Sequence, residues 1–330
     1  MHHHLSVYTA IFVFAAAGCS SNSDPTSPAY PAAPGSVSTN RKAYVGLFGD
    51  QAVAVLDIVT DQVLKKIPVT APDGLIITPD GKKVYVSSMD TGSVKVIPTS
   101  DDAIATSIDV GAKPAGLAIT PDGTHVVVSV GGANEVVIVD AIRDTVVKHV
   151  TVAAAHAACI SADGRYAYVG SQATDAPAVV EVDITGDSPA RSLPVDKSPR
   201  MLSCTPSKIY FTGVGLDAVE VLDVATGKLA TPITSGGSPH DVRATADGKF
   251  ELVVSQTAGD LEFIDTASDT VVDKVPTGKL AHWITPFSDG TGAYVTNEGD
   301  NNVVAVDYAS KRVTDTIPIG NGPRKMALQP

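Results

Sequence analysis

The sequence has little of several residue types, and each shortage argues against a class of protein. Three cysteines in 330 residues are too few for a fold built on a framework of disulfides. Lysine and arginine number 24 against 36 aspartates and glutamates, and the resulting net charge of −12 argues against binding to the phosphate backbone of a nucleic acid. No apolar run approaches the roughly 20 residues that a membrane-spanning helix needs.

Aromatic residues make up only 5% of the chain, and no familiar catalytic motif stands out. We find neither the Ser–His–Asp order of a hydrolase nor a His-Glu-x-x-His run nor a paired-carboxylate motif. Valine, threonine and glycine are abundant instead, as in chains built from β-strands and turns. We therefore expect an all-β protein with a binding or scaffold role rather than a catalytic one.

The first 18 residues resemble an export signal. Leu5–Ala17 has the length of the apolar part of a secretory signal peptide. The segment Ala16–Cys19 (AAGC) resembles the lipobox of bacterial lipoproteins, in which the cysteine becomes the lipidated first residue. The resemblance implies a lipid anchor at Cys19 and an outer-membrane protein of the bacterial cell envelope, facing the periplasm or the exterior. The alternative is an ordinary cleaved signal and a soluble periplasmic or secreted protein.

Residues 19–40 are rich in serine, proline and alanine and have almost no apolar periodicity. This composition predicts a flexible tether between the membrane anchor and the rest of the chain. The globular body then runs from residue 41 to residue 330, a length that suits one closed array of repeats.

A turn signal resembling Thr-Pro-Asp-Gly recurs along the body, about 42 residues apart on average. Its six copies begin at Thr78, Thr120, Ser161, Thr205, Thr245 and Phe287. Each repeat contains four short β-prone runs separated by turn residues, as between Val84 and Gly123. Four-stranded units of this length are the blades of β-propellers.

The strand count predicts seven blades with four strands each. Innermost strands are expected at Gly74–Thr78, Gly116–Thr120, Ala157–Ser161, Met201–Thr205, Asp241–Thr245, Trp283–Phe287 and Lys325–Gln329. The body begins with a second strand at Ala43–Gly46 and ends just after an inner strand. We therefore expect one blade to combine the C-terminal inner strand with three N-terminal strands, which closes the ring and removes exposed sheet edges.

Three segments of the last repeat carry a family resemblance. Ala293–Asn297 (AYVTN), Val304–Asp307 (VAVD) and Thr316–Gly320 (TIPIG) resemble the YVTN-repeat β-propeller family of bacterial periplasmic and surface proteins. The resemblance covers about 290 of the 330 residues and implies a seven-bladed propeller outside the cytoplasm. It implies no single chemistry, because related propellers include lactonases, electron-transfer domains and binding scaffolds.

Aligning the repeats singles out one position, at the start of each inner strand, that should surround the mouth of the central channel. We call its seven residues the ring: Asp73, Ala115, His156, Arg200, His240, His282 and Arg324. Five of the seven are histidine or arginine in a chain with few of either, and Ala115 shows that the scaffold does not demand such a residue. Trp283, the only tryptophan, comes next to the ring and completes the candidate ligand-binding set. Glu298 and other acidic residues of nearby loops are expected to be mostly solvated.

Several roles for the ring remain open at this point. Arginine offers forked donors that match carboxylates and phosphates, so we place a small anionic ligand first. A transition metal bound by His240, His282 and His156 ranks below it, because the neighbouring arginines repel a cation. A lactonase-like or metal-dependent enzyme using the ring is the alternative function, and a purely structural ring is a further reading.

The remaining expectations concern partners and the two cysteines of the body. We expect a monomer without a cofactor, whose flat faces suit an envelope protein or a surface polymer. Side-chain alternation in strands places Cys159 and Cys204 either toward each other or apart. An exported protein can form a disulfide, but we expect two separate, buried cysteines.

Overall fold

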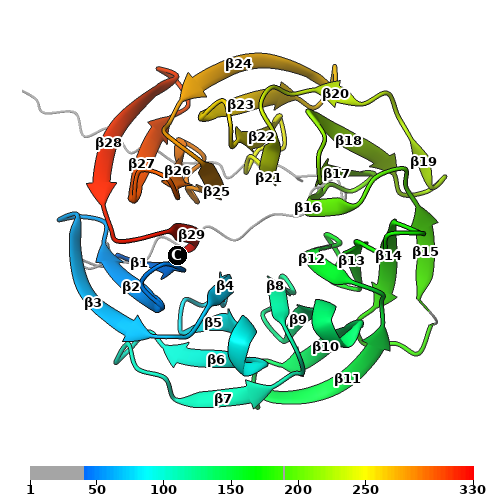
Figure 1. Cartoon of the computed structure of the whole chain (residues 1–330), viewed down its shortest axis with the longest axis horizontal. Helices are drawn as coiled ribbons and strands as arrows, with labels where there is room; N and C mark the ends of the chain where they lie inside the picture. Colours follow the sequence, from blue (N-terminus) through cyan, green and yellow to red (C-terminus); the bar gives the residue numbers. More distant parts are fainter. Residues whose placement is uncertain (1–40, 189) are drawn as a thin grey trace, which may run out of the picture. The chain divides into compact units, whose positions relative to one another are not determined.

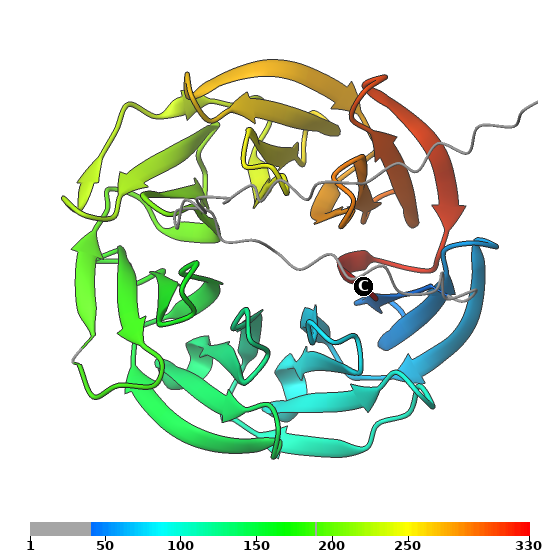
Figure 2. The same ribbon diagram turned by 180° about the vertical axis from the view of Figure 1, so that it is seen from behind.

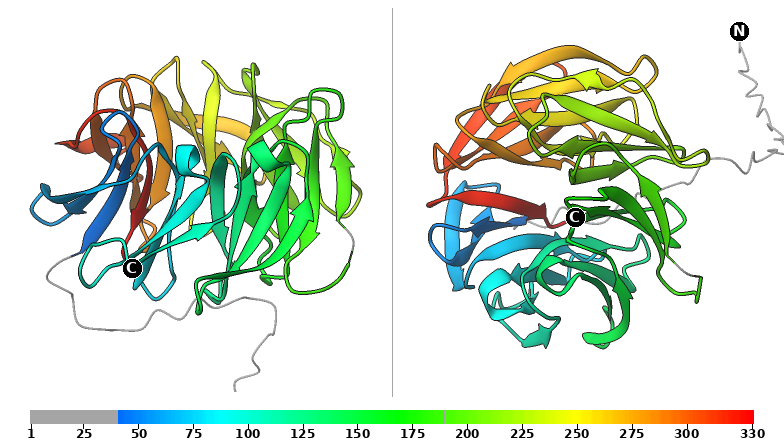
Figure 3. Two further views of the ribbon diagram at one scale, coloured as in Figure 1. Left: turned by 60° about the horizontal axis from the view of Figure 1, so that its bottom comes forward. Right: turned by 45° about the vertical axis from the view of Figure 1, so that its right-hand side comes forward.

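Short β-branched and aromatic runs alternate with turn residues from residue 41 onward, and each run forms a strand. The computed structural model describes residues 41–188 and 190–330 and contains strands β1 to β29 and two single-turn 3-10 helices. Figures 1 and 2 show seven separate sheets arranged around a common axis, and Figure 3 shows their loops gathered at two ends. The prediction of an all-β, seven-bladed propeller is confirmed.

We number the blades from the one that contains the N-terminal strands and give their strands from the axis outward. Blade 1 consists of β29 (Pro323–Leu328), β1 (Lys42–Leu47), β2 (Ala52–Asp57) and β3 (Gln62–Pro68). Blade 2 consists of β4 (Pro72–Ile77), β5 (Lys83–Ser88), β6 (Ser93–Pro98) and β7 (Thr106–Asp109). Blade 3 consists of β8 (Pro114–Ile119), β9 (His125–Val130), β10 (Glu135–Asp140) and β11 (Thr145–Thr151). Blade 4 consists of β12 (Ala155–Ile160), β13 (Tyr166–Ser171), β14 (Ala178–Asp183) and β15 (Arg191–Pro194). Blade 5 consists of β16 (Pro199–Cys204), β17 (Lys208–Gly213), β18 (Ala218–Asp223) and, at its outer edge, β19 (Lys228–Leu229) with β20 (Ile233–Thr234). Blade 6 consists of β21 (Pro239–Ala244), β22 (Phe250–Ser255), β23 (Asp260–Asp265) and β24 (Thr270–Pro276). Blade 7 consists of β25 (Ala281–Pro286), β26 (Gly292–Asn297), β27 (Asn302–Asp307) and β28 (Arg312–Pro318). The helices η1 (Met89–Thr91) and η2 (Gly131–Ala133) each follow a second strand.

The ring closes in the predicted way. Strand β29, red in Figure 1, pairs antiparallel with the blue strand β1, with Tyr44 opposite Ala327 and Val45 opposite Met326. Neighbouring inner strands are in contact all the way around, including β25 with β29 and β29 with β4. One blade is therefore assembled from both ends of the globular body.

Blade 5 departs from the pattern at its outer edge. Its outermost strand is split into β19 and β20, which both pair with β18. Pro232 lies between them and has no N–H to donate to the sheet. The two short pieces together occupy the place of one outer strand.

Every inner strand begins two residues earlier than predicted and carries a β-bulge just after its first residue. In β4, for example, Pro72 pairs with Ser88 and Leu75 with Val86, so residues 73 and 74 bulge out of register. Five of the seven inner strands begin with proline, which the first position of a strand tolerates. The sequence at the bulge resembles a turn and interrupts the alternation of apolar residues, so that alternation did not predict where these strands begin.

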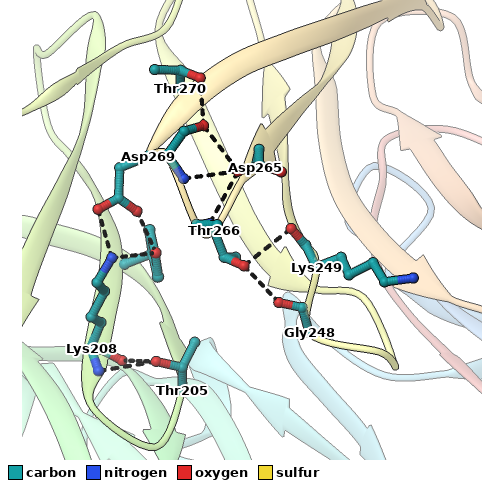
Figure 4. A network of polar contacts seen from close by, with 11 residues as sticks. Thr205, Lys208, Gly248, Lys249, Asp265, Thr266, Asp269 and Thr270 are labelled. Atoms are coloured by element: carbon teal, nitrogen blue, oxygen red, sulfur yellow. Dashed lines mark hydrogen bonds and ion pairs between the residues drawn. The ribbon is translucent and has the colours of Figure 1, made fainter.

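Apolar side chains fill the spaces between neighbouring blades, and polar contacts bridge the same interfaces. In Figure 4, the ammonium of Lys208 lies 2.6 Å from a carboxylate oxygen of Asp269 on the next blade. The hydroxyl of Tyr210 donates to the other oxygen at 2.6 Å. The same trio recurs between other blades as Lys42–Tyr44–Asp102 and Lys83–Tyr85–Asp144.

Cys159 and Cys204 form a disulfide, so the expectation of two separate cysteines is wrong. They lie on β12 and β16, the adjacent inner strands of blades 4 and 5, with Cα atoms 5.6 Å apart. Strand alternation orders side chains within one sheet, whereas these cysteines belong to two sheets that pack face to face. The bond links two blades that share no backbone ladder.

The predicted signal peptide, the lipidation at Cys19 and the tether lie outside the described residues. Within residues 41–188 and 190–330, no helix is long and apolar enough to span a bilayer.

Candidate functional site

The seven ring residues lie together, as predicted. Each is the second residue of its inner strand, in the β-bulge, and bulges at such a rim re-aim side chains. All seven line one cavity of about 430 Å³ at this end of the channel. We call it the channel-mouth cavity.

Hydroxyls on the second strands fix the ring backbone. Thr212 donates to the carbonyl oxygen of His240 at 2.7 Å, and Thr296 donates to that of Arg324 at 2.6 Å. Ser87 donates to the carbonyl of Ala115 at 2.8 Å, where Gly74 packs so closely that a Cβ would lie 2.1 Å from the same oxygen. Each ring residue held in this way is tied to the preceding blade, and for Arg324 on β29 that bond crosses the point where the ring closes.

Arg324 is largely neutralised by acidic neighbours. Its guanidinium lies 3.2 Å from a carboxylate oxygen of Glu298 and 3.7 Å from one of Asp73. It also stacks on the ring of Phe48, with Cζ 3.6 Å from the ring centroid. Glu298 was expected to be solvated but reaches into the cavity instead.

Arg200 is the contrasting cation of the ring. It lies on β16 between His156 and His240, and its guanidinium has no hydrogen bond or ion pair with any described residue. Burial and the charge of Arg324 lower its pKa, but a guanidinium remains protonated at neutral pH. Arg200 is therefore a half-buried positive charge that no described carboxylate pairs, and burial of such a charge is unfavourable until an anion binds to it.

Of the three ring histidines, His240 and His282 are buried and His156 is partly buried, and all three are neutral at pH 7. Burial lowers the pKa of His156 to about 4 and, together with nearby positive charges, holds those of His240 and His282 well below their usual range. The rings of His240 and His282 lie 4.0 Å apart, centroid to centroid. The Nδ1 atom of each histidine is buried without a hydrogen-bond partner among the described residues. A neutral imidazole offers one donor and one acceptor, so each of these three histidines next to the cavity has one ring nitrogen without a hydrogen-bond partner among the described residues.

The described residues do not assemble the predicted metal site. They contain no group of three His, Cys, Asp or Glu side chains that could hold a metal ion. The rings of His240 and His282 lie against each other at an interplanar angle of 42°, and His156 is separated from them by the strand that carries Arg200.

Trp283 does not join the channel-mouth cavity. Its indole N–H donates to the carbonyl of Met326 at 3.1 Å, and its ring lines a separate hollow toward the other end of the channel. Residues that alignment of the inner strands missed take part instead, namely Lys113, Gln172 and Gln256. These residues lie in loops, and nothing in the sequence repeat predicts how far a loop extends toward the axis.

The charges lining the cavity sum to a positive value. Lys113, Arg200 and Arg324 contribute three positive charges, Asp73 and Glu298 contribute two negative ones, and neutral histidines leave +1. The whole chain carries −12. A cationic concavity in an acidic body concentrates anions locally.

The fold and this cavity define a seven-bladed propeller with a small histidine- and arginine-lined site at one channel mouth. A family model described as YNCE-like beta-propeller matches residues 8–328, and the chain belongs to that family. No curated protein matches the sequence.

Solved structures with the same fold serve different chemistries. Hydrazine synthase of Kuenenia stuttgartiensis is 21% identical, with a TM-score of 0.73 over 81% of this chain and 92% of that one. Dihydro-heme d1 dehydrogenase NirN is 19% identical, with a TM-score of 0.66 over 92% and 77%. A putative 6-phosphogluconolactonase of Bacteroides fragilis is 16% identical, with a TM-score of 0.71 over 90% and 99%. At these identities the likeness establishes the fold alone.

Proposed function

We propose that the propeller is a non-catalytic binding module that holds a small oxyanion, a carboxylate or phosphate compound, in the channel-mouth cavity. The observation that carries the proposal is the guanidinium of Arg200, which no described residue pairs, next to three histidines whose Nδ1 atoms have no hydrogen-bond partner among the described residues. A guanidinium donates two parallel hydrogen bonds to a carboxylate or phosphate. The histidines supply neutral donors and acceptors for the rest of the ligand.

The size of the cavity restricts the class of ligand. Its volume of about 430 Å³ falls within the range of roughly 300–1,000 Å³ that is usual for small-molecule sites. A folded partner cannot enter it. Arg324 is held by Glu298 and Asp73, so Arg200 makes the main charge contact and Arg324 orients the far side.

Binding can be measured by calorimetry with citrate and with inorganic phosphate as probes. We expect at least one of them to bind the wild-type protein, and Arg200→Gln to weaken that binding about tenfold or more, as the loss of a charge-assisted pair does. The matched control is Arg191→Gln, which removes an exposed arginine on the outer strand β15 and should leave affinity unchanged. Absence of binding by the wild type, or equal affinity in Arg200→Gln, contradicts the proposal.

We further propose that the protein is exported and anchored by lipid at Cys19, that residues 19–40 tether the propeller to this anchor, and that an envelope protein or a surface polymer is its partner. The proposal rests on the AAGC segment, and the Cys159–Cys204 disulfide suits an oxidising compartment. We expect Cys19→Ala to move the protein from the membrane fraction to the soluble fraction of its bacterial host. A Ser20→Ala control should stay with the membrane, and an unmoved Cys19→Ala protein would refute the anchor.

A further inference from the structure

A second concavity lies at the opposite end of the inner strands from the ring. Its walls come from the last residues of β4, β8, β25 and β29, together with the chain end after β29. The volume is about 340 Å³. We call it the distal hollow. Its apolar walls include Ile77, Ile119, Met326 and Leu328.

Two cations flank the indole of Trp283 beside this hollow. The guanidinium of Arg243 lies 4.0 Å from the ring centroid, and the ammonium of Lys325 lies 4.7 Å from it. Asp241, fully buried, is 3.2 Å from the guanidinium of Arg243 and also accepts the backbone N–H of Ile284. Lys325 is 3% exposed and has no ion pair or hydrogen bond with any described residue. Asp241 thus pairs with Arg243, whereas no carboxylate of the described residues forms an ion pair with Lys325.

The propeller scaffold does not call for these charges. The positions equivalent to Arg243 on the other inner strands are Ile76, Ala118, Cys159, Ser203, Thr285 and Ala327. Those equivalent to Asp241 include Gly74, Gly116 and Ala157 on blades 2 to 4. Charged residues therefore replace small or uncharged ones on blades 6 and 1 only, next to the distal hollow.

We infer that the distal hollow binds a small amphipathic carboxylate, with an apolar body against the isoleucine, leucine and methionine walls and its carboxylate on Arg243. The guanidinium of Arg243 lines the hollow while Asp241 holds one of its edges, which leaves donors on the other edge for a ligand. Trp283 holds the guanidinium plane by stacking, so little side-chain freedom is lost on binding. The inference does not depend on the channel-mouth proposal, since no residue lines both cavities.

Trp283 makes the test specific because it is the only tryptophan in the chain and lies in the hollow. Octanoate, 1-octanol and octylammonium share an apolar tail and differ in the charge of the head group. We expect octanoate to change the tryptophan fluorescence saturably and to bind about tenfold or more tightly than either comparison compound. Calorimetry on the same samples checks that the signal reports binding.

Two variants test the residues. Arg243→Met combined with Asp241→Asn removes the cation without leaving a buried carboxylate unpaired, and should weaken octanoate binding about tenfold or more. Ile119→Glu places a like charge in the apolar wall without touching the ion pair and should weaken it as well. Arg191→Gln, on the outer strand β15 and away from both cavities, should leave octanoate binding unchanged.

Several outcomes would overturn the inference. Octanoate binding that survives both variants, or octanol binding as tight as octanoate, overturns the assignment of a carboxylate site. A lack of any saturable response in the wild type does so too. Loss of octanoate binding in Arg200→Gln would place the ligand at the other end of the channel and also overturn it.

Discussion

Removal of residues 323–330 is expected to abolish the cooperative thermal unfolding of the whole propeller rather than of one blade. Those residues include β29, which pairs with β1 and packs between β25 and β4. Loss of the buried Met326 side chain alone costs about 2–5 kcal/mol, and β1 is left with an unpaired edge beside an open core. Calorimetry and hydrogen exchange of β1 amides measure the effect.

A circular permutant supplies the matched control. Moving residues 320–330 ahead of Arg41 joins β29 to β1 through a turn and makes blade 1 continuous, with the same contacts. It should unfold within a few degrees of the wild type, whereas the truncation should not unfold cooperatively. A truncated protein that keeps its melting temperature would show that the blades are independent units and that closure contributes little.

Replacing Glu251 with glutamine is expected to stabilise the protein at alkaline pH. Glu251 is completely buried on β22, and neither carboxylate oxygen has a hydrogen-bond partner among the described residues. The equivalent positions on the other second strands are all apolar: Ala43, Val84, Val126, Ala167, Ile209 and Ala293. Burial raises the pKa of Glu251 to about 8, against smaller opposing effects of the nearby Ser203 hydroxyl and Arg243 charge, while Asp241 raises it further.

The sign of the pH dependence follows from this raised pKa. The folded state holds the proton more tightly than the unfolded state, so stability falls as pH rises from about 4.5 and levels off above about 8. A difference of this size corresponds to a cost of about 5 kcal/mol at pH 9. Glutamine stays neutral, so Glu251→Gln should match the wild type near pH 4.5 and exceed its unfolding free energy by about that amount at pH 9.

Denaturant unfolding across this pH range measures the difference. Asp175→Asn, which neutralises an exposed carboxyl on a loop, should shift stability equally little at both ends of the range. If Glu251→Gln follows the wild-type curve at every pH, the carboxyl is hydrated or paired in solution and the burial argument fails.

The ring of seven blades was predictable because each of its signals is local. Asp-Gly turns, short β-branched runs and their period are properties of neighbouring residues, and a second strand at one end with an inner strand at the other required closure. The same alignment placed His156, Arg200 and the other ring residues correctly around one cavity. The starts of the inner strands were harder to predict from the sequence, because bulges interrupt the alternation of apolar residues there.

A position on the second strands also carries one exceptional residue among the seven blades. Glu251 occupies a position that is apolar on the other six blades, a signal as clear as the one that singled out the ring. Arg243 pairs with Asp241, which lies two residues earlier on the same strand. Its stacking on Trp283 joins two blades and had no signal along the chain.

The sequence by itself determined the strands, their number, the closure of the ring and the set of residues at the channel mouth, because periodicity and turn chemistry act over a few residues. Only the tertiary structure decided which charges meet. Glu298 neutralises Arg324, whereas no carboxylate in residues 41–188 and 190–330 pairs with Arg200. Cys159 bonds to Cys204, and Trp283 belongs to the distal hollow. These pairings form between side chains of different sheets, where small shifts in register and bulge geometry set the distances.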